Sequence, residues 1–112
     1  MKLTLEGLKD IQGWKNAGVK LPAFDIKKVR EETIQNPEWV HFGVGNIFRI
    51  FIGSIADSLL EQGLSKTGIV CAETFSFDII DEIYKPQDNL VLGVTLKPDG
   101  NVTKQVIGSL AQ

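Results

Sequence analysis

The chain has 112 residues, a net charge of -2 and a hydrophobic content of 43%, which are ordinary values for one globular domain with a single core. The charged residues make up 23% of the chain and form no basic patch, so we expect no nucleic-acid partner. No apolar run approaches the roughly 18 residues that span a bilayer, so we expect no membrane partner either.

The first 37 residues indicate two short helices separated by a loop. Apolar residues recur at near-helical spacing between positions 4 and 16, which predicts a short amphipathic helix; they are Leu5, Leu8, Ile11 and Trp14. Gly18 and Pro22 then break the pattern and predict a loop. Asp25 precedes IKKVREETIQ and is a candidate N-cap for a surface helix that ends near Pro37.

The middle of the chain indicates a strand, a helix and a second strand. The run from Trp39 to Phe42 is mostly apolar without alternation, which is typical of a parallel strand covered on both faces. Apolar residues then recur at three- and four-residue steps from Ile47 to Leu60, which predicts a helix of about four or five turns ending at Gly63. TGIVCAE follows as the second strand, so the unit is βαβ with a right-handed crossover.

The last third of the chain indicates a short helix and a β-hairpin. SFDIIDEIY has a helical pattern, and NLVLGVTLKPDGNVTKQVIGSL has two β-rich runs around the turn Pro98-Asp99-Gly100-Asn101. The expected fold class is therefore α/β: a partial Rossmann-like βαβ unit with an N-terminal helical segment and a C-terminal β-hairpin.

The turn GVGN between the first strand and its helix is the candidate binding site. A helix that follows a parallel strand presents free N–H groups and the positive end of its dipole, which favour a pyrophosphate. Gly43 can make the sharp turn, and Gly45 can let a ligand approach the backbone. The usual fingerprint has a small residue where this chain has Phe48, so a purely structural turn remains the alternative.

Four side chains around this turn could contact a dinucleotide. Glu73, at the end of the second strand, can accept hydrogen bonds from an adenosine ribose and disfavour a 2′-phosphate. Asp78 is the second candidate for that role, and a solvated glutamate at a strand end is the plain alternative. Arg49 can reach a phosphate or a neighbouring acidic group, and Asn46 can cap the helix or bind the cofactor.

The residues support neither a catalytic set nor a metal site. His41, the only histidine, lies within the first strand, so we interpret it as a packed histidine and not a general base. It is 30 residues from Cys71, which is not the spacing of a ligand cluster, and no Ser/His/Asp or Cys/His set is evident.

Cys71 lies in the apolar run GIVCA, which predicts a buried, inert thiol and fits a reducing cytoplasm. The start MKLTLEGLKD carries charges before any signal-peptide core.

At VHFGVGNIFR the sequence resembles the mannitol dehydrogenase family, the long-chain polyol dehydrogenases and hexuronate reductases, whose cofactor turn has the form Gly-x-Gly-Asn-aromatic-x-Arg. LPAFD and QDNLVLGVTLKPDGNVTKQVIGSL resemble the segments before and after this turn in that family, so the resemblance covers most of the chain from Leu21 onward. Relatives also tolerate a bulky residue at the position of Phe48. The resemblance implies an NAD site lined by Gly43, Gly45, Asn46, Ile47, Phe48 and Arg49, with an acidic group, Glu73 or Asp78, near the ribose.

The resemblance also implies an activity. EWVHFGVGNIFR and MKLTLEGLKD are most similar to the fructuronate reductase branch, which interconverts a keto-sugar acid and a hydroxy acid, and the mannitol 2-dehydrogenase and tagaturonate reductase branches are the alternatives. Members carry a second, mainly helical domain with a lysine general base, a motif not found here. We therefore expect a piece of a longer NAD-dependent enzyme for a sugar acid or polyol, inactive by itself.

This interpretation divides the chain into two parts. Residues 1–37 are the N-terminal helical and loop extension, and residues 38–112 are the N-terminal part of a dinucleotide-binding domain. A small open sheet without the rest of such a domain exposes apolar faces, so we expect self-association. The rival hypothesis is a standalone nucleotide-binding module without catalysis.

Overall fold

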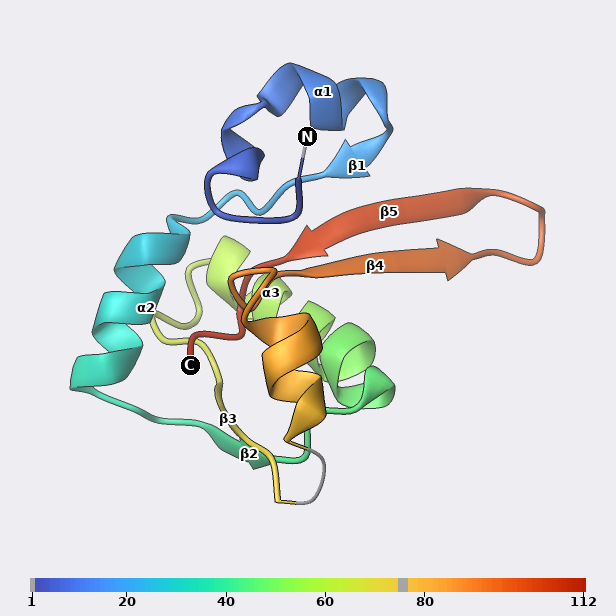
Figure 1. Cartoon of the computed structure of the whole chain (residues 1–112). Coiled ribbons are helices and arrows are strands. Elements are labelled where there is room, and N and C mark those ends of the chain that lie inside the picture. Colours follow the sequence, from blue (N-terminus) through green and yellow to red (C-terminus); the bar gives the residue numbers. More distant parts are fainter. Residues whose placement is uncertain (1, 75–76) are drawn as a thin grey trace.

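Five strands form two small sheets in the computed structural model, which describes residues 2–74 and 77–112 (Figure 1). The first sheet has the order β1 (Val19–Lys20), β5 (Val102–Ile107), β4 (Val91–Leu96), with β1 parallel and β4 antiparallel to β5. The second sheet pairs β2 (Val40–Phe42) in parallel with β3 (Val70–Ala72). The predicted parallel strands and the predicted hairpin are therefore confirmed.

The end of the chain lies beside β3 and extends the parallel sheet. The N–H of Ile69 donates to the carbonyl oxygen of Ser109 at 2.8 Å, and the N–H of Ala111 donates back to Ile69 at 2.9 Å. The N–H of Cys71 donates to the carbonyl oxygen of Gln112 at 2.7 Å. Three parallel segments therefore lie side by side, with β3 in the middle.

The helix after the glycine turn is confirmed and has two parts. A π-helix, η2 (Phe48–Ile52), continues directly into α3 (Gly53–Glu61). A Cβ on Gly53 would lie 3.1 Å from the Ile107 side chain, so glycine allows the helix to approach β5 closely. Helix α3 ends two residues before Gly63, which has φ +72°. This left-handed conformation is the common way to end a helix.

The N-terminal segment differs from the prediction in two respects. The single helix expected between positions 4 and 16 is divided into η1 (Gly7–Lys9) and α1 (Ile11–Asn16), because the carboxylate of Asp10 accepts from the N–H of Gly13 at 3.1 Å and begins a new helix. The expected loop after it contains strand β1, whose two residues pair with β5 far along the chain. A strand this short has no local pattern to reveal it.

The second predicted helix is confirmed as α2 (Ile26–Gln35). The side chain of Asp25 accepts from the N–H of Lys28 at 3.2 Å, as its proposed N-cap role requires. The buried hydroxyl of Thr33 accepts a hydrogen bond of 2.9 Å from the N–H of Gly68. This bond ties α2 to the segment that leads into β3.

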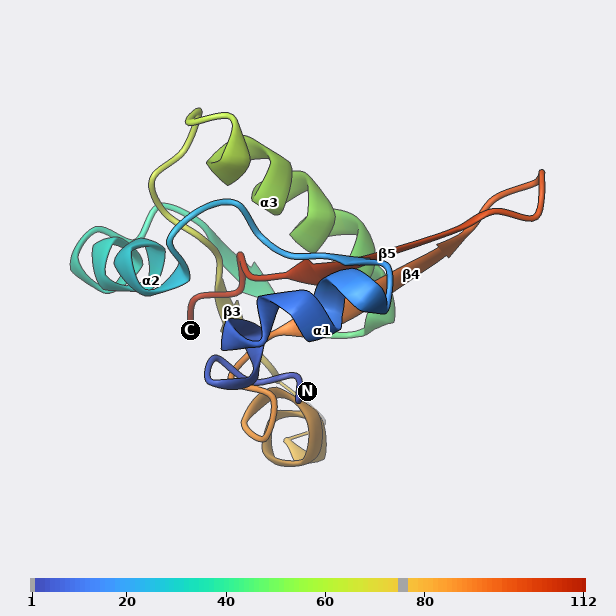
Figure 2. The ribbon, with the colours of Figure 1, turned by 90° about the horizontal axis from the view of Figure 1, so that it is seen from above.

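The predicted helix after β3 is confirmed within the described residues as a helical stretch that contains η3 (Ile80–Tyr84), a π-helix; Ser76, the first residue predicted for it, lies outside them. Figure 2 shows the β4–β5 hairpin projecting away from the rest of the fold. None of the helices in the described ranges is long and apolar enough to cross a membrane.

Two apolar clusters form the core. The larger one lies between the sheets, η2, α3 and η3, and contains Val44, Phe48, Ala56, Ile69, Tyr84, Val91, Ile107 and Leu110. The smaller one fixes the N-terminal segment on the hairpin and contains Trp14, Val19, Leu90 and Val106. The expectation that the first strand is covered on both faces is wrong for β2: Val40 is 51% and Phe42 71% exposed, because β2 lies at the edge of its sheet.

Candidate functional site

The glycine turn lies where β2 ends and the helix begins. Gly43 has φ +99°, a conformation that favours glycine, and its N–H donates to the carbonyl oxygen of Ala72 at 2.7 Å. A Cβ built on Gly43 or on Gly45 would meet no atom within 4 Å. The turn therefore has an open face on which a ligand could approach the backbone.

The middle residue of the turn is fixed from two sides. Val44 is fully buried, and its carbonyl oxygen accepts a hydrogen bond of 2.9 Å from the hydroxyl of Tyr84 in η3. Its N–H donates to the carboxylate of Glu73 at 3.3 Å. The turn is thus anchored to η3 and to the end of β3, while Gly45, Asn46 and Ile47 remain exposed.

Glu73 lies at the turn, as the sequence predicts. Besides the bond from Val44, its carboxylate accepts from the N–H of Thr74 at 2.9 Å. Asp78, the second candidate for the ribose role, is exposed near the start of the η3 helical stretch. The carboxylate that contacts the turn is therefore that of Glu73.

Arg49 and Asn46 interact with each other in the first turn of the helix. The Arg49 guanidinium donates to the side-chain oxygen of Asn46, and its central carbon lies 5.8 Å from the centroid of the Tyr84 ring, which is within cation–π range. The Nε atom of Arg49 is buried and has no hydrogen-bond partner among the described residues. The Asn46 side chain accepts from Arg49, and the structure shows no side-chain cap at the start of η2.

Phe48 and Ile47 point in different directions. The Phe48 ring is buried and stacks on the His41 ring, with centroids 4.2 Å apart and an interplanar angle of 13°. Ile47 is 79% exposed. The interpretation of His41 as a packed histidine is confirmed, and of these two turn residues only Ile47 presents its side chain to the open surface.

The structure places Cys71 at a less buried position than the sequence predicts, because β3 is only partly covered. The residue is half-buried, and burial raises the pKa of its thiol to about 12, so the thiol stays protonated and unreactive near neutral pH. Within residues 2–74 and 77–112, no group of three or more His, Cys, Asp or Glu residues could hold a metal ion.

Sequence reasoning missed two buried polar residues, one that holds the turn and one that joins α3 to the end of the chain. The Tyr84 hydroxyl holds the turn, and burial raises its pKa; a lone tyrosine in an apolar helix pattern was the available signal, because a buried hydroxyl needs a partner. Asp57 of α3 is buried, and its carboxylate accepts from the N–H groups of Gly108 and Ser109, at 2.8 Å from the latter. Burial raises the pKa of Asp57 to about 6 despite these bonds.

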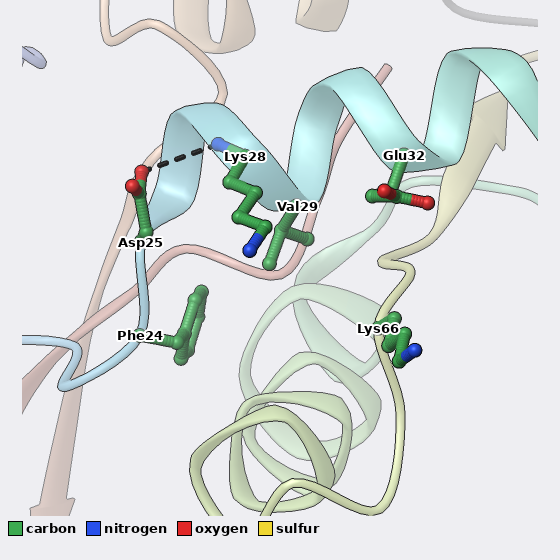
Figure 3. Close-up of a pocket in the computed structure, with 6 residues that line it drawn as sticks. All are labelled: Phe24, Asp25, Lys28, Val29, Glu32 and Lys66. Atoms are coloured by element: carbon green, nitrogen blue, oxygen red, sulfur yellow. Dashed lines mark hydrogen bonds between the residues drawn. The ribbon is translucent and has the colours of Figure 1, made fainter.

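Of two cavities in the structure, one adjoins the glycine turn and the other does not. One of about 460 Å³ adjoins the turn and is lined by Leu3, Asn46, Arg49, Ile50, Ile83, Gln87, Val91 and Leu92, and its size suits a small ligand. The other, of about 290 Å³, lies on α2 and is lined by Phe24, Asp25, Lys28, Val29, Glu32 and Lys66 (Figure 3). This second cavity is lined by both positive and negative side chains, and the Asp25 carboxylate already caps α2. Only the first cavity therefore belongs to the candidate site.

Several known proteins are similar to this chain in sequence or in fold. No family model matches the chain. D-mannonate oxidoreductase of Thermotoga maritima is 46% identical over the whole chain, which covers 21% of that protein. A substrate-free D-sorbitol dehydrogenase structure has a TM-score of 0.69 at 32% identity, over 86% of this chain and 19% of that one. Mannitol 2-dehydrogenase of Pseudomonas fluorescens, in a ternary complex with NAD and D-mannitol, has a TM-score of 0.78 at 23% identity, over 100% and 21%.

These matches confirm the expected α/β fold class. The chain spans about a fifth of the length of each of these proteins.

Proposed function

This chain resembles the mannitol dehydrogenase family in sequence and in fold, and we propose that it supplies the cofactor-binding part of a cytoplasmic, NAD-dependent oxidoreductase. The proposed reaction interconverts a keto-sugar acid and the matching hydroxy acid, fructuronate and mannonate. The observation that carries this proposal is the 46% identity to a D-mannonate oxidoreductase along all 112 residues.

The open face of the glycine turn supports the cofactor site. A pyrophosphate lying against Gly43 and Gly45 would meet backbone instead of side chains, and the helix dipole favours its charge. The guanidinium of Arg49 adds a positive charge at the first helical turn. NAD, when bound, donates or accepts a hydride. Asn46, Ile47 and the backbone of Phe48 complete the proposed lining.

The ribose contact is assigned to Glu73. Its carboxylate already lies at the turn, where it can accept hydrogen bonds from a ribose diol and repel a 2′-phosphate. Asp78 is the alternative because it follows the same strand. We therefore propose a preference for NAD over NADP.

The general base of the reaction is proposed to lie in a longer protein, beyond this sequence. We propose that residues 1–37 are an extension and that residues 38–112 begin the dinucleotide-binding domain. The substrate is a sugar acid or, in the mannitol 2-dehydrogenase alternative, a polyol. The higher identity to the mannonate enzyme than to mannitol 2-dehydrogenase, 46% against 23%, favours the sugar acid; a tagaturonate reductase is the second sugar-acid alternative.

The test is an assay of the longer protein that contains this sequence. We expect NADH oxidation that depends on fructuronate, and a slower reaction with fructose or tagaturonate. Absence of activity with every ketose and keto-acid, from a folded protein, would reject the oxidoreductase. NADH binding without any turnover would favour a nucleotide-binding module without catalysis.

The chain by itself is proposed to self-associate through exposed apolar faces. The exposed residues include Val40, Phe42, Ile47 and Phe51, on β2 and along the helix after the turn. Large exposed apolar patches are uncommon on monomers. Light scattering on the purified chain should give a mass above that of one copy.

A further inference from the structure

The cavity beside the glycine turn has one wall that comes from the start of the chain. Leu3 lines this cavity together with Asn46 and Arg49, although these residues are far apart in the sequence. The other lining residues belong to η2, the η3 helical stretch with the loop that follows it, and β4. The N-terminal segment therefore reaches the candidate site as well as the hairpin.

Two kinds of contact fix the start of the chain beside the loop that connects η3 to β4 (Figures 1 and 2). The N–H of Leu5 donates to the Asp88 carboxylate of this loop at 2.8 Å. The side chains of Leu3, Leu5 and Leu8 pack on the smaller apolar cluster. Asp88 is itself held, because its carbonyl oxygen accepts a hydrogen bond from the guanidinium of Arg30 in α2. The position of Leu3 is thus set by tertiary contacts.

Arg49 is the only charged residue among the described residues that line the cavity. Its Nε atom is buried, without a hydrogen-bond partner in the described part of the chain, and its guanidinium lies over the Tyr84 ring. A charge that is shielded from water attracts an opposite charge more strongly and is screened less by salt. The access of water to this guanidinium therefore determines how strongly it attracts a pyrophosphate on the turn.

We propose that Leu3 is a positioning residue of the cofactor site, which closes the cavity from the N-terminal side and keeps water away from the Arg49 guanidinium. This inference rests on the proposed function, because it requires the pyrophosphate of NAD to bind at the turn. Asp88 acts one step further away, since it holds the backbone of Leu5 and thereby the position of Leu3. The N-terminal segment is then a part of the binding site.

The test is a fluorescence titration of the longer enzyme with NADH at several salt concentrations. Leu3→Ser should weaken NADH binding by about fivefold and make the affinity fall more steeply between about 0.05 and 0.5 M salt, because water then reaches Arg49. A loss of packing alone would not change the salt dependence. Leu8→Ser is the matched control, because Leu8 packs on the same apolar cluster but does not line this cavity.

Asp88→Gly tests the hold on the N-terminal segment without a change inside the cavity. Glycine suits the positive φ of 51° at this position, and the substitution removes the carboxylate that accepts from Leu5. We expect a smaller loss of NADH affinity with the same steeper salt dependence. Asn89→Gly is the matched control, since Asn89 also has a positive φ, 59°, but the N–H of Leu5 donates to Asp88. Equal losses in both variants would overturn the role of Asp88.

A double-mutant cycle tests whether Leu3 acts through Arg49. Arg49→Met removes the charge, so Leu3→Ser should cause no further loss of NADH affinity in that background. Equal losses with and without Arg49, or a folded Leu3→Ser variant with the affinity and salt dependence of the parent, would overturn the inference and leave the cofactor site standing. A parent enzyme that does not bind NADH would reject the proposed function and this inference with it. Circular dichroism checks that each variant is folded.

Discussion

The carboxylate of Glu73 and the backbone N–H of Val44 lie 3.3 Å apart, which joins the end of β3 to the middle of the glycine turn. Val44 is also held from the other side, because its carbonyl oxygen accepts from Tyr84. Because Val44 is buried and held by these two hydrogen bonds, it fixes the position of the exposed Gly45 beside it. The same contact places an acidic group next to the surface on which we propose that NAD binds.

Replacing Glu73 tests the ribose contact. In the longer enzyme, Glu73→Ser should remove the repulsion of a 2′-phosphate and shift the ratio of NADH to NADPH affinity by about tenfold toward NADPH, the equivalent of about 1.4 kcal/mol. The measurement is a pair of fluorescence titrations. Asp78→Ser is the matched control, and a shift in that variant with no change in Glu73→Ser would move the assignment to Asp78.

Tyr84→Phe tests the anchor of the turn. The substitution keeps the buried ring but leaves the buried carbonyl oxygen of Val44 without its donor, which costs about 1–2 kcal/mol. Urea unfolding should show that loss in the free energy of unfolding. NADH affinity should also fall, because the turn is less rigidly held. Unchanged stability would mean that the hydroxyl does not support the turn.

The buried carboxyl of Asp57 should make the free energy of unfolding depend on pH. Because burial raises the pKa of its carboxyl from 3.8 to about 6, the folded state binds the proton more tightly than the unfolded state does. The free energy of unfolding should therefore fall as pH rises from 4 to 6, by an amount no larger than about 3 kcal/mol from this residue. Above about pH 7, where the carboxyl is ionised in both states, its contribution should be constant.

The measurement is urea unfolding at several pH values for the parent and for Asp57→Asn. The asparagine of this variant retains a side-chain oxygen that can accept from Ser109, but it has no carboxyl group to titrate. The free energy of unfolding of the variant should therefore depend less on pH between 4 and 6. An equal pH dependence in both proteins would show that other groups cause it.

The βαβ unit and the hairpin were predictable because their signals are local. The apolar steps from Ile47 to Leu60 reflect a helix face, and the turn residues around Gly100 mark the hairpin. Strand β1 was not predictable, since only its pairing with Lys104 and Gln105 defines it. The exposure of β2 was mispredicted for a related reason, because composition indicates a parallel strand without telling whether it lies at an edge.

The residues that could contact a dinucleotide were predictable from the sequence, but the residues that hold the glycine turn in place were not. Glu73 was expected near the turn from strand order alone, and the structure brings the two together. The bond from Tyr84 to Val44 joins residues 40 positions apart, which no spacing rule indicates. The Arg49–Asn46 contact also replaces the helix cap that Asn46 alone suggested.

The central claim is that the open face of the glycine turn binds NAD, and the most direct test is an NADH titration of the longer enzyme with Gly45→Val. The backbone at Gly45 does not require glycine for its conformation, and the added side chain would meet no protein atom nearby, so the fold should persist, as circular dichroism can check. We predict an NADH affinity weaker by about tenfold or more, with Gly45→Ala intermediate. An unchanged affinity in folded Gly45→Val would contradict the assignment of this turn as the cofactor site.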